Sequence, residues 1–149
     1  MDYSIIAKSY DELYGEEQRN KLKIIKKHIP NESFLLDIGC GIGIAKEFFP
    51  NSIGIDHNFS LLNDVCCSGE YLPFKDKSFD SVICVTVLHH IKDLDKTLKE
   101  IRRVGKDYFA FSVMKKARNF SYIIEKVKEY FNVVEIEEEK DIILIEHVK

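Results

Sequence analysis

The residues with the clearest chemical potential lie in a short loop in the first third of the chain. The apolar run Phe34–Ile38 contains Asp37 and is followed by three glycines at alternate positions, Gly39, Gly41 and Gly43. Such a run predicts a buried strand that ends in a turn, with a helix beginning near Ile44. Glycine has no Cβ atom, so the backbone can turn sharply and approach a ligand closely. Because a helix N-terminus adds free N–H groups and a positive dipole end, the sequence predicts a binding loop for a nucleotide-type ligand.

Two residues of this loop narrow the type of nucleotide. The dinucleotide fingerprint G-x-G-x-x-G requires a third glycine where the chain has Ile44. The negative charge of Asp37 would repel a pyrophosphate on the same loop, whereas it suits a ligand whose near end is cationic, such as an amino-acid ammonium. A dinucleotide is therefore disfavoured, and a strand-to-helix turn without a ligand is the remaining alternative.

The run from Asp37 to Gly43, Asp-Ile-Gly-Cys-Gly-Ile-Gly, resembles motif I (D/E-x-G-x-G-x-G) of the class I S-adenosylmethionine-dependent methyltransferases. The resemblance implies that Asp37 holds the methionine end of S-adenosylmethionine, directly or through water. It also implies that the loop lies against the cofactor, through Gly39, Cys40, Gly41 and Gly43. S-adenosylhomocysteine would then be the product.

A second carboxylate stands at the end of the next predicted strand, Ser52–Asp56. An acidic side chain in this place can accept two charge-assisted hydrogen bonds from a ribose diol. Asp56 follows Gly39 at about the distance expected within one βαβ unit. Its position is similar to that of the family's ribose-binding acid, which implies a cofactor contact for Asp56 and for its neighbour His57.

The segment that begins at Ser68 is similar to the family sequence G-D-A-E-x-L-P-F. In that family the aspartate commonly meets the adenine amino group, and here Ser68 takes its place. Serine still accepts a hydrogen bond but is shorter and uncharged. The resemblance therefore implies an adenine contact by Ser68, with backbone groups at Gly69 and Glu70 as alternatives.

Two histidines follow the most strand-like segment, Phe79–Val87, whose nearly continuous apolar character fits a central parallel strand. The run Leu-His-His-Ile-Lys-Asp resembles the L-H-H-x-x-D element of a methyltransferase subgroup that includes quinone-biosynthesis enzymes, not the N-P-P-Y element of amide- and adenine-N-methylating relatives. The resemblance implies cofactor contacts for Val85 and Leu88. His89 or His90 could act as a general base, because the histidine pKa lies near working pH, or could pack against the cofactor or hold the loop.

The N-terminal segment offers one further candidate. The stretch around Tyr10 looks like the Tyr-Asp-containing entry segment of many class I methyltransferases, in which a tyrosine can close over the cofactor. Simple packing is the alternative for Tyr10. We expect a short helix and turn that end at Gly15, and then a helix over Glu16–Ile29. The lysines of this helix are expected to form a solvated face, with a nucleic-acid patch as the alternative; they are Lys21, Lys23, Lys26 and Lys27.

The remaining elements complete a predicted fold. Asp93 is expected to cap a helix that ends at Val104, followed by a turn over 105–107. Later elements are expected as a strand over 108–113, a helix over 119–130 and two strands over 133–137 and 141–147. The short link between the last two makes them an antiparallel pair. The family resemblance implies an α/β, Rossmann-like class I methyltransferase fold, mostly parallel and seven-stranded, with a C-terminal antiparallel hairpin and helices on both faces.

Composition is consistent with one domain over residues 1–149. The chain is 45% hydrophobic and 32% charged with a net charge of −3, so no general attraction to nucleic acid or membranes is expected. No apolar run approaches a membrane span, and no signal-peptide pattern begins the chain. The four cysteines lack paired C-x-x-C spacing, which favours reduced packing residues in a cytoplasmic protein over a metal site or a disulfide.

We therefore expect a methyltransferase that moves a methyl group to an unidentified acceptor by in-line displacement. The alternative is an inactive, methyltransferase-like module that binds the cofactor or serves as a scaffold. The segments that usually wall the acceptor pocket are short here. The acceptor is accordingly expected to be a macromolecule, or a second subunit completes the site, with Lys115, Lys116 and Arg118 near that contact. Simple solvation is the alternative for these three.

Overall fold

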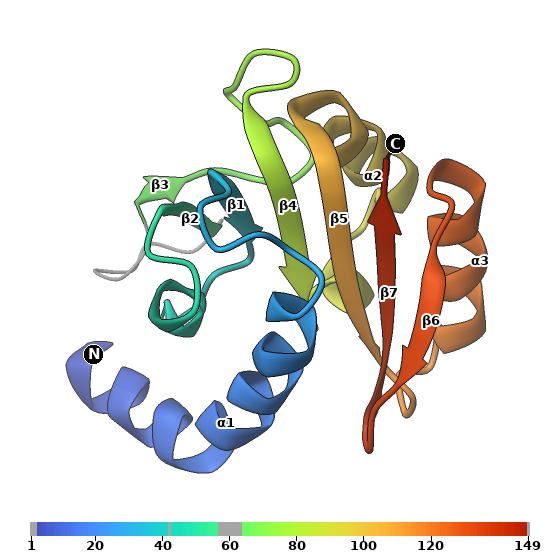
Figure 1. Cartoon of the computed structure of the whole chain (residues 1–149). Helices are drawn as coiled ribbons and strands as arrows, with labels where there is room; N and C mark the ends of the chain where they lie inside the picture. The colour runs from blue at the N-terminus through green and yellow to red at the C-terminus, as the bar shows by residue number, and fades with distance from the viewer. Residues whose placement is uncertain (1–2, 42, 57–63, 149) are drawn as a thin grey trace.

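The computed structural model describes residues 3–41, 43–56 and 64–148, and of residues 3–14 the backbone alone. The chain forms a seven-stranded sheet with the order β3-β2-β1-β4-β5-β7-β6 (Figure 1). The strands are β1 (Leu35–Ile38), β2 (Ser52–Asp56), β3 (Val65–Cys66), β4 (Phe79–Val85), β5 (Gly105–Met114), β6 (Val134–Glu137) and β7 (Asp141–His147). Within this sheet β7 is the strand that pairs in the antiparallel sense, with β5 and β6. The predicted fold class is therefore confirmed.

The strand order places the glycine loop at a topological switch point. From β1 the chain continues to β2 and β3 on one side, whereas β4 and β5 lie on the other. In open α/β sheets the loops that leave two such neighbouring strands diverge and open a crevice beyond their carboxyl ends. The loop after β1 and the segment after β4 both lie at this crevice.

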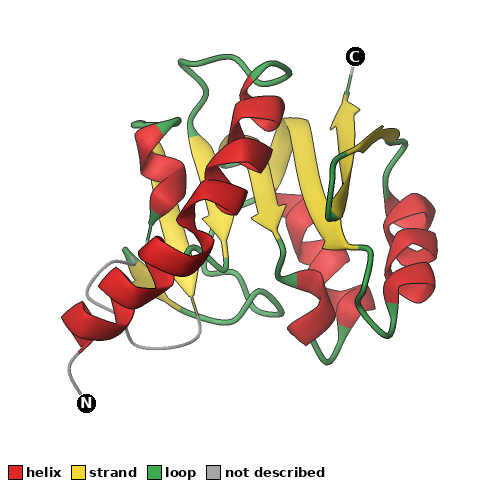
Figure 2. Cartoon of the chain, turned by 90° about the horizontal axis from the view of Figure 1, so that it is seen from below, coloured by secondary structure: helices red, strands yellow, loops and turns green. Residues whose placement is uncertain are grey.

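Helices cover both faces of the sheet. Helices α2 (Leu94–Val104) and α3 (Phe120–Tyr130) pack on one face, and α1 (Tyr3–Lys26) with the short 3₁₀ helix η1 (Ile44–Glu47) packs on the other. Seen from below, α1 crosses in front of the sheet, along the edge where β4 ends (Figures 1 and 2). None of the described helices combines the length and the apolar character needed to cross a membrane.

The central strand β4 is buried on both faces, as its composition predicts. Val82 and Cys84 pack on the side of α2 and α3, while Ile83 packs on the side of α1. The strand ends at Val85, two residues before its predicted end. The reason is Thr86, which has a φ of 56° and cannot continue an extended strand.

Two predicted breaks in the chain are wrong. Helix α1 continues through Gly15 to Lys26 as one helix of 24 residues. A glycine inside a helix costs about 1 kcal/mol relative to alanine, and packing of an apolar face can outweigh that cost. Here Leu22 and Ile25 are buried against the sheet and supply such a face.

The predicted turn after Val104 is also absent, because α2 passes directly into β5 at Gly105. A Cβ atom on Gly105 would lie 2.5 Å from Cε1 of Phe109 and 2.8 Å from Cγ2 of Val82. The glycine therefore lets the chain enter the sheet beneath a packed aromatic ring, without a connecting loop.

Candidate functional site

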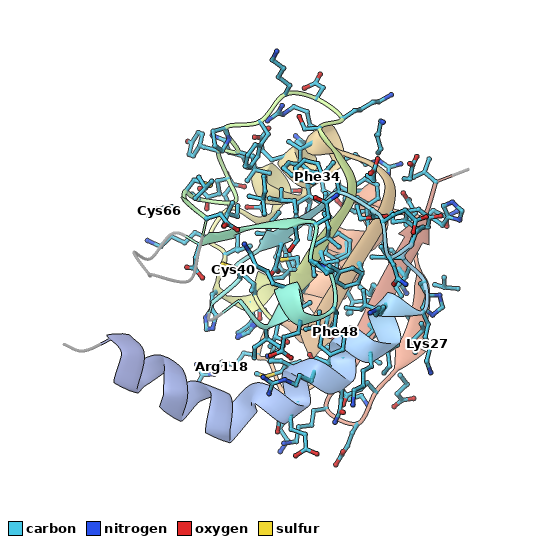
Figure 3. All side chains as sticks on the ribbon, turned by 60° about the vertical axis from the view of Figure 1, so that its left-hand side comes forward. Lys27, Phe34, Cys40, Phe48, Cys66 and Arg118 are labelled. Atoms are coloured by element: carbon cyan, nitrogen blue, oxygen red, sulfur yellow. The ribbon has the colours of Figure 1, made fainter. Side chains whose placement is uncertain are left out.

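The backbone of the glycine loop after β1 has the conformation that a close approach to a ligand requires. Gly39, Gly41 and Gly43 all have positive φ angles, of 72°, 53° and 77°. A Cβ atom on Gly39 would lie 2.5 Å from Cγ2 of Val87, so no side chain fits there. A Cβ atom on Gly41 would meet no described atom within 4 Å, which leaves this backbone facing open space. Figure 3 labels Cys40, which marks this loop.

The loop is also tied to β2. The backbone N–H groups of Gly39 and Cys40 both donate to the carbonyl oxygen of Ile55, at 2.8 and 2.9 Å. The following helix begins at Ile44 as predicted, but η1 is a 3₁₀ helix of only four residues. So short a helix has little macrodipole, and the glycine backbone itself must supply the contacts to a ligand.

Two carboxylates lie at this loop. Oδ2 of Asp56 accepts a hydrogen bond from the N–H of Gly41 at 3.1 Å. Asp37 is only 6% exposed. Burial first, and the negative charge of Asp56 second, raise the pKa of the Asp37 carboxyl to about 7. A cationic ligand beside Asp37 would relieve this unfavourable arrangement.

The larger of two cavities, about 300 Å³ in volume, opens on one side of the loop. Its walls include Gly39, Asp56, Gly69 and Thr97. Two of the predicted residues, Ser68 and Glu70, also line it. Their side chains have partners within the protein, since Oγ of Ser68 accepts from the N–H of Glu70 at 3.2 Å and Oε1 of Glu70 accepts from the N–H of Asp93 at 3.3 Å.

The smaller cavity, about 90 Å³ in volume, opens on the other side of the loop. Asp37, Cys40 and Gly41 line it together with Val85 and Thr86, and helix α1 contributes Gln18 and Leu22. Gly39 and Val87 belong to the walls of both cavities. The two cavities therefore meet at these residues, with Asp37 in one and Asp56 in the other.

The two predicted histidines lie in the short 3₁₀ helix η2 (Leu88–His90), which follows β4. Their ring centroids are 3.9 Å apart. His90 lines the larger cavity, whereas His89 lines neither cavity. His89 is partly buried, and that burial, followed by the charge of His90, lowers the pKa of His89. His89 is therefore a neutral imidazole near pH 7.

Other predicted site residues lie elsewhere. Leu88 is buried in the hydrophobic core and lines neither cavity. The side chain of Tyr10 and the whole of His57 lie outside the described residues. Burial first, and the nearby Asp37 next, raise the pKa of the Cys40 thiol to about 12, so Cys40 stays protonated and is a poor nucleophile.

A buried polar network lies beneath the smaller cavity, and the sequence did not predict it. Nζ of Lys21 lies 2.8 Å from Oγ1 of Thr86 and 3.1 Å from Oδ2 of Asp141. Oγ1 of Thr86 also lies 3.0 Å from Oγ of Ser112 and donates to Asp141. The prediction that Lys21 is solvated is wrong, because it is 2% exposed. The network ties α1 to the carboxyl end of β4 and holds Thr86 in its left-handed conformation.

The predicted basic residues Lys115, Lys116 and Arg118 follow the carboxyl end of β5 and so lie at the same edge of the sheet as the glycine loop. Nζ of Lys115 pairs with Oε1 of Glu137 at 2.8 Å, so part of its charge is already balanced within the protein. Any contact of this segment with an acceptor would have to compete with that ion pair.

Comparison with known proteins adds independent information. A family model described as a methyltransferase domain matches residues 36–108. An uncharacterised protein of Methanocaldococcus jannaschii is 37% identical over 125 residues, which cover 74% of this chain and 49% of that protein. A protein of Encephalitozoon cuniculi that is provisionally named a methyltransferase is 36% identical over 117 residues, 66% of this chain and 55% of that protein. The chain thus spans about half the length of these relatives.

Solved structures agree on the fold. A protein from Pyrococcus horikoshii superposes with a TM-score of 0.75 at 18% identity, covering 95% of this chain and 99% of that one. The N-methyltransferase NodS from Bradyrhizobium japonicum, in complex with S-adenosylhomocysteine, gives 0.67 at 13% identity over 89% of this chain and 86% of that one. A Haloferax volcanii protein in complex with a methyltransferase activator superposes with a TM-score of 0.66 at 18% identity, covering 88% of this chain and 74% of that one.

Proposed function

Because the chain belongs to the class I S-adenosylmethionine-dependent methyltransferase family, we propose that it binds S-adenosylmethionine and transfers the methyl group to an acceptor. The observation that carries this proposal is the pair of cavities that meet at Gly39, with Asp56 in the wall of one and Asp37 in the wall of the other. The larger cavity, with Asp56, has the size and the acid for an adenosine. The smaller cavity, with Asp37, suits the amino-acid end.

The cofactor, when bound, supplies a methyl group on a positively charged sulfur that is open to in-line attack. The chain's own residues mainly hold the two reactants in position and remove water from around them. Asp56 accepts hydrogen bonds from the ribose diol, and Asp37 balances the ammonium. Gly39 and Val87 line both cavities and so lie where the two cavities meet. There they exclude water from the reacting atoms.

Two features concern the acceptor. His89, held neutral at physiological pH, is available to take a proton from an acceptor that loses one, and His90 at the cavity wall instead packs against the cofactor. The acceptor is a macromolecule, or a second subunit completes its pocket, with Lys116 and Arg118 near the contact. The Haloferax structure, solved with an activator, supports the idea of a partner.

Removal of the Asp56 carboxylate should weaken cofactor binding. Charge-assisted hydrogen bonds contribute about 1.5–3 kcal/mol each, so Asp56→Ala is expected to lower the affinity for S-adenosylhomocysteine about tenfold or more. Calorimetric titration measures this. Asp76→Ala, which removes a carboxylate on the exposed surface, is the matched control and should leave the affinity unchanged. Equal affinities of the Asp56 variant and the control would contradict the ribose role.

The reaction itself is tested with a screen for methylated product. The chain is incubated with S-adenosylmethionine and cell extract divided into small molecules, RNA and protein, and each fraction is examined by mass spectrometry. A product that depends on the chain and is reduced by Asp56→Ala supports the transferase. A cofactor that binds but never yields S-adenosylhomocysteine with any fraction would favour the inactive module instead.

A further inference from the structure

The larger cavity contains a polar group that is left without a partner. Thr97, in the second turn of α2, is 0% exposed and lines this cavity. Its hydroxyl oxygen has no hydrogen-bond partner within residues 3–41, 43–56 and 64–148. A buried polar group in this state costs about 1–3 kcal/mol, and native proteins contain few of them. Such a group in a ligand cavity indicates a contact that the ligand completes.

The neighbouring turn keeps side chains away from this hydroxyl. A Cβ atom on Gly69 would lie 3.3 Å from Cγ2 and 3.9 Å from Oγ1 of Thr97. Glycine at this position therefore lets the turn pass close to Thr97 without a side chain between them. The other two polar residues of the turn, Ser68 and Glu70, are already bonded within the protein.

The rest of the cavity wall indicates which part of a ligand lies there. Ile38, Ile55, Val87 and Ile91 present apolar surface, which suits an aromatic ring. Asp56, one of the two carboxylates in the wall of this cavity, suits a diol. The edge of a purine carries hydrogen-bond donors and acceptors, and a threonine hydroxyl can serve as either.

We propose that the hydroxyl of Thr97 forms a hydrogen bond with the purine base of the cofactor and so contributes to the choice of base. This inference rests on the proposed function, because it requires that an adenosine occupy the larger cavity. It assigns a specificity role to a helix residue outside every motif of the sequence.

Two substitutions separate the hydroxyl from the rest of the side chain. Thr97→Val keeps the shape and the β-branch but removes the hydroxyl, and Thr97→Ser keeps the hydroxyl. Thr97→Val is expected to weaken S-adenosylhomocysteine binding about three- to tenfold by calorimetry, whereas Thr97→Ser should remain within about twofold. In the absence of ligand, Thr97→Val should raise the midpoint of thermal unfolding by about 2–4 °C, because it removes an unpartnered buried group.

Ser81→Ala is the matched control. Ser81 lies in β4, is 0% exposed, lines neither cavity and has a hydroxyl that is also unpartnered within the described chain. Its replacement should raise the unfolding midpoint without changing the affinity. If the native protein binds S-adenosylhomocysteine and Thr97→Val binds it equally well, the inference is wrong while the proposed function stands. Lower stability together with weaker binding that Thr97→Ser does not restore would show a structural role and also overturn it. Absence of binding by the native protein would overturn both.

Discussion

Replacement of Lys21 with methionine is expected to destabilise the protein by about 3–5 kcal/mol, because it leaves the carboxylate of Asp141 buried and without its cation. The side chains of Lys21 and Asp141 are 3% and 1% exposed, so water cannot compensate. The hydrogen bond from Lys21 to Thr86 would be lost with the ion pair. Chemical denaturation of the native protein and the variant measures the difference in free energy of unfolding.

An exposed ion pair provides the control for this prediction. Lys106 and Asp80 are 4.0 Å apart and about half exposed, and Lys106→Met should cost less than about 1 kcal/mol. The double variant Lys21→Met with Asp141→Leu should recover much of the loss, since replacing both members of a buried pair by apolar groups is often neutral. A Lys21→Met variant as stable as Lys106→Met would contradict the structural importance of the network.

Replacement of Asp37 with asparagine is expected to change how stability depends on pH. The pKa of Asp37 is raised from 3.8 to about 7 in the folded protein. Between about pH 4 and pH 7 the folded chain keeps a proton that the unfolded chain has released. The contribution of this group to the free energy of unfolding therefore falls as the pH rises through that window, by about 4 kcal/mol for a shift of this size.

Thermal unfolding from pH 4 to pH 8 tests this directly. Asp37→Asn should remove that fall and be more stable than the native protein at pH 8. The same substitution should weaken S-adenosylhomocysteine binding, and the native affinity should rise with pH through 7, because an ammonium favours the ionised carboxylate. A variant that is less stable at every pH and binds the ligand unchanged would show that Asp37 serves only the fold.

The sequence alone was enough to propose those parts of the candidate site whose residues lie close together along the chain. Asp37 and the glycines lie within one strand-turn unit, and Asp56 ends the next strand, so spacing along the chain was enough to propose both carboxylates. The fold was implied by the family resemblance of these motifs, together with the short link that makes the last two strands an antiparallel pair. Only the structure shows that the Gly41 N–H donates to Asp56 and thereby links the two motifs.

Residues whose roles depend on distant partners could not be predicted in this way. Lys21 resembles its solvated neighbours on α1, and nothing local indicates that Asp141, far along the chain, lies beside it. The hydroxyl of Thr97 has no hydrogen-bond partner among the described residues, and the role proposed for it depends on the course of the turn at Gly69. Local propensity favours a break in the chain at Gly15 and at Gly105, whereas tertiary packing determines the structure at both positions.

The central claim is that the two cavities together hold S-adenosylmethionine. Calorimetric titration of the native protein with S-adenosylmethionine, S-adenosylhomocysteine and NAD tests this claim most directly. One site that binds both sulfur compounds and does not bind NAD is expected, because Asp37 favours a cation and disfavours a pyrophosphate. Binding of NAD more tightly than either sulfur compound would contradict the account.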